Sequence, residues 1–183
     1  MKLHLGTFPS PLGELLLVTD EQEQVCALDY ADHRARLRRG LGEHYGDCEL
    51  VDAPVPAAVA TALGKYFDGD LAALDGLVTA AAGSDLQRQV WDALDGIPPG
   101  QTTSYGDLAH ALGFEDPRAA IEIGAALNAN PVAIIVPCHR VIARNGDLKG
   151  YAGGASRKRW LLEHEGALSK AAEPVEAPRL PGF

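Results

Sequence analysis

The sequence has few cysteines and no cysteine pattern that would hold a metal or a disulfide framework. Its three cysteines, Cys26, Cys48 and Cys138, include no CxxC pair, and three thiols cannot all pair with one another. His33 and His44 lie near the first two cysteines, but this irregular spacing is weak support for a zinc site. We therefore predict no metal and at least one free thiol.

The sequence also lacks a long apolar run. No stretch approaches the roughly 18 consecutive apolar residues that a membrane span needs. The first residues show no basic flank followed by an apolar core, as a secretory signal would. With 46% hydrophobic and 22% charged residues in a chain of 183, the composition is that of a globular protein of one domain or two small ones. We expect a cytoplasmic monomer that does not bind membranes.

A general excess of basic residues is absent as well. The net charge of −9 argues against indiscriminate binding to nucleic acid, because phosphate contacts normally rest on a basic surface. The acidic excess is concentrated before residue 84. The segment 138–160 has the opposite balance, with only Asp147 against these cations: Arg140, Arg144, Lys149, Arg157, Lys158 and Arg159. We therefore expect a local basic patch around Cys138.

The periodicity of the sequence divides the chain into two parts. The first part has short apolar stretches between turn residues, which predict strands at 3–5, 14–19 and 48–51 and helices at 34–39 and 55–67. The Ala- and Gly-rich segment 75–83 is the best candidate for a linker. Beyond it the apolar spacing is helical, so we predict an α+β protein with domains at 1–80 and 84–166. A Pro-containing tail from residue 167 to residue 183 is expected to be disordered.

Capping signals predict four helices in the second part. Their starts are marked by Ser84, Ser104, Asp116 and Ser156. Gln87, three residues after Ser84, completes the pattern of a capping box. The two middle helices are short and are joined by a turn that contains glycine, which is typical of a helix-turn-helix. An ordinary αα-hairpin fits this pattern at least as well.

Cys138 is the strongest candidate for a reactive side chain. It follows the apolar run 132–136, which predicts a buried strand or extended segment, and it precedes His139 and Arg140. A thiol with an ordinary pKa of about 8.5 is mostly protonated at neutral pH, so its reactivity depends on a neighbouring base and positive charge. A lone cysteine after an apolar strand is otherwise a buried packing residue. Glu165 is the best candidate for a carboxylate that holds the His139 imidazole, although by itself it would be a solvated charge.

Four motifs in the second part resemble one known family. They are Asn130-Pro131, Pro137 to Ile142 (PCHRVI), Gly150 to Gly154 (GYAGG) and Lys158 to Gly166 (KRWLLEHEG). In this order they are similar to the O6-alkylguanine-DNA alkyltransferases, over residues 84–166. The turn at 10–13 and the strand pattern around it resemble the N-terminal domain of that family more weakly.

The resemblance implies a fold, a partner and a reaction. The fold is an N-terminal ribonuclease H-like α/β domain followed by a winged-helix-like helical domain that carries the helix-turn-helix. The partner is double-stranded DNA containing O6-alkylguanine, with O4-alkylthymine as a further candidate substrate. In this family the helix-turn-helix enters the minor groove and the damaged nucleotide is flipped into a pocket beside the thiol. The resulting thioether is a very poor leaving group, so one molecule repairs one base, without a cofactor.

The resemblance also assigns roles to individual residues. It implies that Cys138 accepts the alkyl group, that His139 is a base acting through a bridging water, and that Glu165 orients the imidazole. The other catalytic positions that it implies are Asn130, Tyr105 and Lys158. The implied contacts with the base are Tyr151, Ala152, Val141 and Leu127. The implied contacts with DNA are Arg118, Ile121, Gly124, Ala125, Ala126 and Arg140.

The resemblance also implies a specific task for several of these residues. Asn130 would brace the turn that holds the site. Tyr105 would hydrogen-bond the flipped guanine and stabilise the charge that develops as the base leaves, whereas by itself it would be a packing residue at a helix start. The backbone N–H of Ala152 would meet O6, and this donor survives although many relatives have serine there.

The sequence departs from the family pattern in the second helix of the helix-turn-helix. Most members have an arginine there that enters the base stack, whereas this chain has Ile121 followed by Glu122. An aliphatic wedge can still occupy a vacated base position, as minor-groove architectural proteins demonstrate. The Glu122 carboxylate would meet phosphates or the negative minor groove, and Arg118 would compensate for part of this.

Two other functions are compatible with the sequence. One is a non-enzymatic protein that binds alkylated bases and flags the lesion, with transfer impaired or absent because of Ile121 and Glu122. The presence of Cys138 argues against it. The other is a thiol hydrolase built on Cys138, His139 and Glu165, for which no oxyanion hole can be identified in the sequence.

We expect the double variant Ile121→Arg, Glu122→Ala to bind methylated duplex DNA severalfold more tightly and to repair it faster. The reason is that one negative charge is removed and one positive charge is added where the minor groove is expected to lie. Single-turnover rates on methylated duplex and on free O6-alkylguanine would be compared. The rate on the free base should not change, and a variant that improves neither duplex binding nor duplex repair would contradict the hypothesis.

Overall fold

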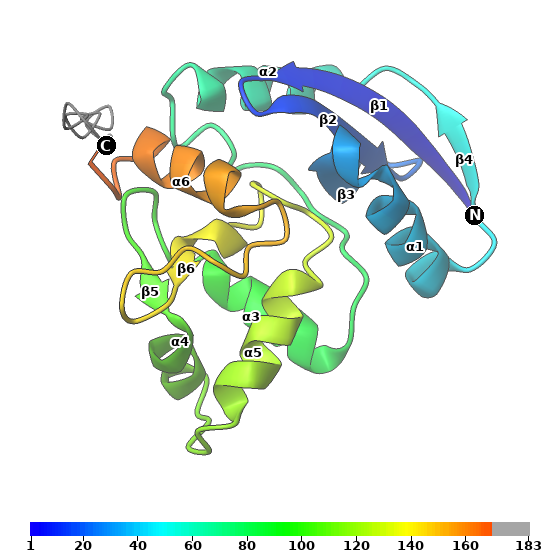
Figure 1. Ribbon diagram of the computed structural model, residues 1–183. Coiled ribbons are helices and arrows are strands. Elements are labelled where there is room, and N and C mark those ends of the chain that lie inside the picture. Colours follow the sequence, from blue (N-terminus) through cyan, green and yellow to red (C-terminus); the bar gives the residue numbers. More distant parts are fainter. Residues whose placement is uncertain (170–183) are drawn as a thin grey trace, which may run out of the picture.

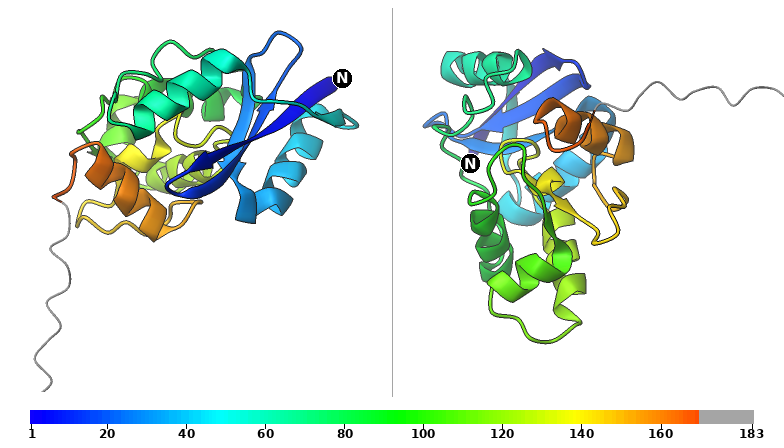
Figure 2. Two further views of the ribbon diagram at one scale, coloured as in Figure 1. Left: turned by 90° about the horizontal axis from the view of Figure 1, so that it is seen from above. Right: turned by 90° about the vertical axis from the view of Figure 1, so that its left-hand side faces the viewer.

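The computed structural model describes residues 1–169 and consists of two packed parts, a sheet with helices and a mainly helical part (Figure 1). Figure 2 shows the same arrangement from two further directions. The predicted disordered tail lies outside the described residues except for 167–169. Within that stretch the Ala167 amide donates to the Leu162 carbonyl over 2.8 Å, so the chain still follows the end of the last helix there.

The first part is built on a four-stranded sheet in the order β3-β2-β1-β4. Its strands are β1 (Lys2–Ser10), β2 (Gly13–Thr19), β3 (Val25–Tyr30) and β4 (Glu49–Asp52). The first three form an antiparallel meander and β4 lies parallel to β1. The structure adds β3, which the sequence did not mark because all six of its residues are buried and no alternation is visible.

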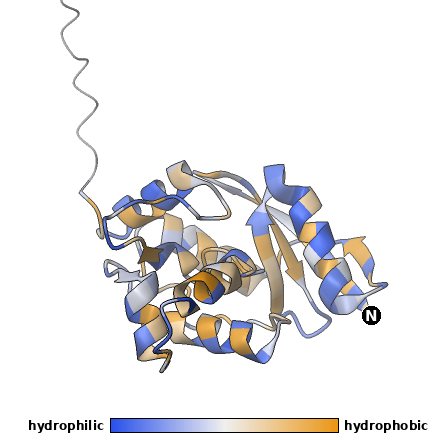
Figure 3. Ribbon diagram, turned by 60° about the horizontal axis from the view of Figure 1, so that its bottom comes forward, coloured by the Kyte–Doolittle hydropathy of each residue, from blue (hydrophilic) through white to orange (hydrophobic). Residues whose placement is uncertain are grey.

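Both faces of this sheet are covered. Leu16 and Val18 of β2 face a core shared with α1 (Arg34–Tyr45), whereas Leu15 and Leu17 face the core shared with α2 (Ala57–Phe67) and the second part. This follows from the two-residue period of a strand. Figure 3 shows largely hydrophobic strands with helices of mixed hydropathy around them. The sheet therefore forms the wall against which the second part packs.

The second part contains four helices and a two-stranded sheet. The helices are α3 (Asp85–Leu94), α4 (Tyr105–Ala111), α5 (Ala119–Asn128) and α6 (Ala155–His164). Strands β5 (Thr103–Ser104) and β6 (Val141–Ile142) pair in parallel. Two short 3-10 helices complete the chain, η1 (Ala31–His33) and η2 (Cys138–Arg140). No helix within residues 1–169 is long and apolar enough to cross a bilayer.

Three predicted segments differ from the structure. The connection between α4 and α5 runs over 112–118, longer than a tight turn, because α5 begins only at Ala119. Asp116 is its turn residue and accepts the Arg118 amide over 2.9 Å. The run 132–136 is not a strand, since it makes a single bridge to β3 at Val132 and then turns at Ile134, which has φ 70°. Helix α1 is longer than predicted and ends at Tyr45.

Strand β3 joins the two parts through its backbone. Leu28 donates to the Pro131 carbonyl and accepts from the Ala133 amide, both over 2.9 Å. On the same strand Val25 donates to the Val78 carbonyl (3.0 Å) and accepts from the Ala80 amide (2.8 Å). The predicted linker is therefore partly held against the sheet, and the turn after α5 is fixed to it.

The capping box at α3 gives a test of the local analysis. Ser84 accepts the Gln87 amide over 3.2 Å and Gln87 accepts the Ser84 amide over 2.9 Å. We expect Ser84→Ala to lower the free energy of unfolding by about 1 kcal/mol, because a helix N–H loses its partner. The matched control is Ser156→Ala at an exposed position of α6, which should change stability by less than about 0.5 kcal/mol in denaturant titrations. Equal effects of the two substitutions would contradict this account.

Candidate active site

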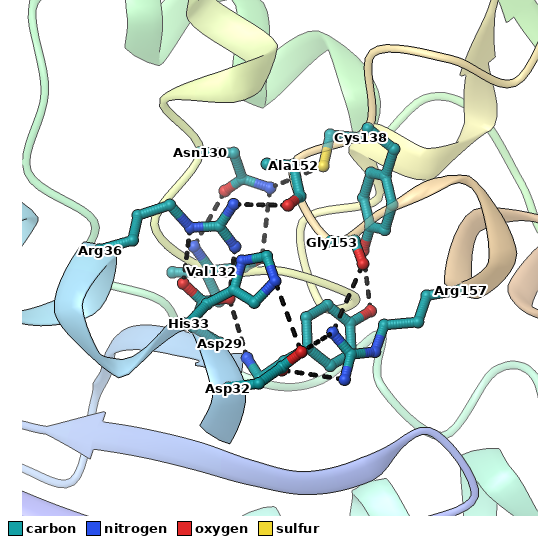
Figure 4. Close-up of polar contacts among 12 residues, drawn as sticks. Asp29, Asp32, His33, Arg36, Asn130, Val132, Cys138, Ala152, Gly153 and Arg157 are labelled. Atoms are coloured by element: carbon teal, nitrogen blue, oxygen red, sulfur yellow. Dashed lines mark hydrogen bonds and ion pairs between the residues drawn. The ribbon is translucent and has the colours of Figure 1, made fainter.

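Cys138 lies in the one-turn helix η2 at the meeting point of the two parts and is 8% exposed. The Asn130 amide nitrogen donates to its sulfur over 3.2 Å (Figure 4). The same nitrogen donates to the Val136 carbonyl over 3.0 Å, and the Asn130 oxygen accepts the Val132 amide over 3.0 Å. Asn130 therefore braces the turn that carries the cysteine, as the sequence predicts.

Burial is the main influence on the Cys138 thiol and raises its pKa above the ordinary value. The Asn130 hydrogen bond and the positive charges of Lys158 and Arg36 act in the opposite direction and are outweighed. The thiol is therefore protonated at neutral pH in the resting protein. It needs a base when it reacts, because only the thiolate is a strong nucleophile.

The base candidate is His139, which is completely buried next to the cysteine. Its Nε2 lies 2.8 Å from Oε1 of Glu165. Burial comes first among the influences on the Glu165 pKa and raises it, but the hydrogen bonds from His139 and Arg140 overcome this and hold the pKa at about 2. An ionised carboxylate only accepts, so the Nε2 atom carries the proton and Nδ1 has a free lone pair.

Nδ1 of His139 makes no hydrogen bond to any atom of residues 1–169. Burial also lowers the pKa of His139 below its ordinary value, despite the opposite influence of Glu165. The imidazole is therefore neutral and has one uncommitted acceptor. These are the properties of a general base.

Arg140 is placed differently from the prediction. It was expected to contact DNA, but its guanidinium lies inside the protein and donates to both Glu165 oxygens, over 3.0 Å and 2.9 Å. A further bond of 2.7 Å reaches the Ile97 carbonyl. A bidentate pair with a carboxylate fixes the plane of that carboxylate, so Arg140 holds Glu165 and its guanidinium is buried rather than displayed on the surface.

Lys158 and Tyr105 form the opposite side of the site. The Lys158 side chain is buried and its ammonium donates to the Val141 carbonyl over 2.6 Å. It lies 5.9 Å from the centre of the Tyr105 ring. Burial lowers the pKa of Lys158 and raises that of Tyr105, so the phenol stays protonated and can donate. A Cβ added at Gly150 would lie 3.4 Å from the Tyr105 hydroxyl, which places Tyr105 against the loop 150–154.

The loop 150–154 is held by residues of the first part. Arg36 of α1 donates to the Ala152 carbonyl over 2.7 Å and also pairs with Asp29 of β3, with Nε 2.9 Å from Oδ2 (Figure 4). The Tyr151 and Tyr30 hydroxyls are 2.9 Å apart. Sequence analysis missed these contacts of the first part because nothing in the local pattern of α1 or β3 distinguishes them from surface charges and core residues.

The expected DNA-contacting residues divide into exposed and buried groups. Arg118, Glu122 and Ala125 are exposed, and Ile121 is 76% exposed, which is unusual for a large hydrophobic residue. Gly124 is half-buried. Ala126, which was expected to contact DNA, is 3% exposed and faces the core of the second part instead. Leu127, which was expected to contact the base, is 6% exposed and also faces this core.

The predicted basic patch around Cys138 is largely neutralised. Arg140 and Lys158 are buried in the site. The other cations are paired with carboxylates, so they do not form a free basic face: Arg144 with Asp107, Arg157 with Asp32, Lys149 with Asp147, and Arg159 with Glu163. Asp107 and Asp32 come from distant segments and could not be counted from the local sequence, whereas Asp147 and Glu163 lie close to their partners in the chain. Within residues 1–169 no cluster of three or more His, Cys, Asp or Glu side chains has the arrangement of metal ligands.

Comparison with known families matches both parts of the chain. Residues 3–80 match the 6-O-methylguanine DNA methyltransferase ribonuclease-like domain, and residues 85–167 match the DNA-binding domain of the same proteins. The chain belongs to the 6-O-methylguanine DNA methyltransferase family. The predicted two-part α+β fold and the resemblance drawn from the sequence are thereby confirmed.

Individual relatives support this membership over nearly the whole chain. The methylated-DNA–protein-cysteine methyltransferase of Salmonella typhimurium is 50% identical over 161 residues, covering 87% of this chain and 93% of that protein. The Mycobacterium bovis protein of the same name is 40% identical over 179 residues, covering 95% and 96%. The structure of Mycobacterium tuberculosis OGT in complex with DNA matches with a TM-score of 0.73 at 35% identity, covering 91% of this chain and 94% of that one.

The buried carboxylate gives this family member a specific dependence of stability on pH. The pKa of Glu165 is lowered from an ordinary 4.5 to about 2, so its ionised form stabilises the fold above about pH 4.5 and this contribution is lost as the pH falls toward 2. We expect Glu165→Gln to remove of the order of 3 kcal/mol of this pH-dependent stability at neutral pH. The difference between the two proteins should shrink below pH 4.5 in denaturant titrations.

The control for this measurement is Glu21→Gln in an exposed turn, which should change the free energy of unfolding by less than about 0.5 kcal/mol. A difference between wild type and Glu165→Gln that stays constant from neutral to acidic pH would show that Glu165 is not ionised by its partners in the folded state.

Proposed function

We propose that this protein repairs DNA by transferring an alkyl group from O6 of guanine to the sulfur of Cys138, once per molecule and without a cofactor. The proposal rests on the arrangement of three groups, which are the Cys138 thiol, the His139 imidazole and the Glu165 carboxylate. The Asn130 amide donates a hydrogen bond to the Cys138 sulfur. The neighbouring His139 is neutral, its Nε2 is hydrogen-bonded to Glu165, and its Nδ1 has no partner within residues 1–169. This arrangement supplies a nucleophile, a base and an orienting carboxylate.

The proposed reaction begins with removal of the thiol proton. A bridging water accepts the proton from Cys138 and gives one to Nδ1 of His139, while Glu165 stabilises the resulting imidazolium. The sulfur then attacks the alkyl carbon, the carbon–oxygen bond breaks, and the electrons of that bond remain on the guanine oxygen. Tyr105 donates a hydrogen bond to the departing base, and the Lys158 charge nearby favours the negative charge that develops there.

The proposed recognition of guanine uses the loop 150–154 and the chain around the cysteine. Tyr151 packs on the flipped base and the Ala152 N–H meets O6. The Val141 carbonyl uses one lone pair for Lys158, so its second lone pair can accept from the exocyclic amine of guanine. Base flipping is required because O6 of a stacked guanine is beyond the reach of a buried sulfur.

The partner that we propose is duplex DNA, bound in the minor groove by α4 and α5. The match to Mycobacterium tuberculosis OGT, whose structure is known with DNA, supports nucleic acid as the partner. The exposed Ile121 is the wedge that replaces the flipped base, and Arg118 and Ala125 share its exposed side of α5. O4-alkylthymine is a second substrate to be tested. A purely lesion-binding role is not favoured, because it would leave the Cys138, His139 and Glu165 arrangement without a purpose.

Incubation with an oligonucleotide containing O6-methylguanine should add one methyl group to the peptide that contains Cys138. Mass spectrometry of that peptide is expected to show complete, permanent and stoichiometric labelling, because a thioether does not leave again. Cys138→Ser should remain unlabelled, and Cys48→Ser should label like wild type, since Cys48 lies outside the site. Turnover of excess substrate would favour the hydrolase alternative, and binding of the oligonucleotide without labelling would favour the lesion-binding alternative.

A further inference from the structure

A tyrosine of the N-terminal part reaches the active-site carboxylate. Building on the proposed function, we propose that Tyr66 of α2 is a positioning residue of the alkyl transfer, which acts by donating its hydroxyl hydrogen bond to Glu165. The Tyr66 oxygen lies 2.8 Å from Oε1 of Glu165, in the interior of the molecule. The N-terminal ribonuclease-like domain thereby contributes a group to the chemistry carried out in the C-terminal domain.

Oε1 of Glu165 is the common acceptor of three donors. His139 Nε2 lies 2.8 Å from it, the Tyr66 hydroxyl 2.8 Å and Arg140 Nη2 2.9 Å. Within residues 1–169, Oε2 receives only Arg140 Nε, over 3.0 Å. The Tyr66 bond therefore falls on the oxygen that holds the imidazole. The Tyr66 hydroxyl and the His139 N–H therefore share Oε1 as their acceptor.

The direction of the Tyr66 hydrogen bond follows from the charges around it. The tyrosine side chain is 0% exposed, and its burial together with the Glu165 charge raises the pKa of the phenol well above its ordinary value. The phenol therefore keeps its proton. Because the carboxylate can only accept, the hydroxyl must donate to it.

Tyr66 is itself held by the helix that carries Glu165. Helices α2 and α6 lie side by side (Figure 1), and the Tyr66 and His164 rings meet edge to face with centroids 5.2 Å apart. His164 Nε2 lies 2.7 Å from the Tyr66 carbonyl oxygen. Since Glu165 directly follows His164 at the end of α6, the hydroxyl and the carboxylate are fixed in relation to each other by backbone as well as side-chain contacts.

A donor on Oε1 moderates the attraction between the carboxylate and the imidazole. Without the Tyr66 hydrogen bond, more of the negative charge on Oε1 of Glu165 is available to His139. This charge favours the imidazolium and raises the pKa of His139. The other charged or titratable groups that face this cluster are Arg140 of η2, Lys158 and His164 of α6, and Tyr30 of β3. None of these is altered by a change at Tyr66. If the pKa of His139 is raised, the imidazole becomes protonated at a higher pH, and the protonated form cannot act as a base.

The test is Tyr66→Phe, which removes one oxygen and keeps the ring. Below the pKa of His139, the single-turnover rate constant of methyl transfer at saturating methylated duplex should fall about threefold to tenfold, because a raised pKa of His139 leaves less of the imidazole in its neutral, basic form. The acidic limb of its pH profile should move to higher pH. The dissociation constant for the duplex should not change, since Tyr66 is buried away from the DNA-facing helix α5.

The matched control is Tyr45→Phe in α1. Tyr45 also donates its hydroxyl to the protein, to the Ala80 carbonyl over 3.0 Å, on the other face of the sheet. This variant should keep the wild-type rate and pH profile. A folded Tyr66→Phe protein with wild-type rate and pH profile, or an equal loss in Tyr45→Phe, would overturn the proposal.

A second variant tests the same bond without removing it. Site-specific 3-fluorotyrosine at position 66 makes the phenol a stronger donor, so the acidic limb should move to lower pH, opposite to Tyr66→Phe. This measurement decides the question if Tyr66→Phe does not fold, and an unshifted limb would overturn the proposal. Failure of the proposed function itself would look different, because the wild-type protein would then leave Cys138 unlabelled in every case.

Discussion

The site depends on one buried negative charge. The Glu165 carboxylate is removed from water and is balanced by the Arg140 guanidinium, the His139 imidazole and the Tyr66 hydroxyl, which come from two different parts of the chain. An ionised carboxylate without these partners would be costly to bury, so the partners and the charge require one another. The same charge sets the tautomer of His139 and leaves its Nδ1 free to act as a base.

The two parts of the molecule therefore form a single site. Strand β3 bonds through its backbone to the segment after Asn130, and Arg36 of α1 bonds to the Ala152 carbonyl of the loop 150–154. The segment after Asn130 and the loop 150–154 are therefore both fixed to the N-terminal part. An N-terminal domain that only enlarged the core would not need polar contacts at these positions, since hydrophobic packing would be sufficient.

The buried groups around Cys138 and the surface expected to face DNA consist of different residues. The groups around Cys138 are complete and buried, whereas the surface expected to face DNA carries Ile121 and Glu122, and the cations near the site are mostly paired with carboxylates. Electrostatic attraction to phosphate is sensitive to such pairing, but an intramolecular proton transfer within a buried cluster is not. The hypothesis that Ile121 and Glu122 weaken duplex binding therefore concerns residues outside the buried cluster around Cys138.

The sequence alone predicted the order of the helices and the capping box at Ser84, and it marked Cys138, His139 and Glu165 as candidate site residues. These predictions depend on local spacing and on short motifs. It did not determine the burial of Arg140, the pairing of the basic residues or the contacts of Tyr66 and Arg36 with the site. These join residues up to 125 positions apart, as Asp32 and Arg157 are. Partners brought together only by packing leave no periodic or local signal, so the tertiary structure alone decided them.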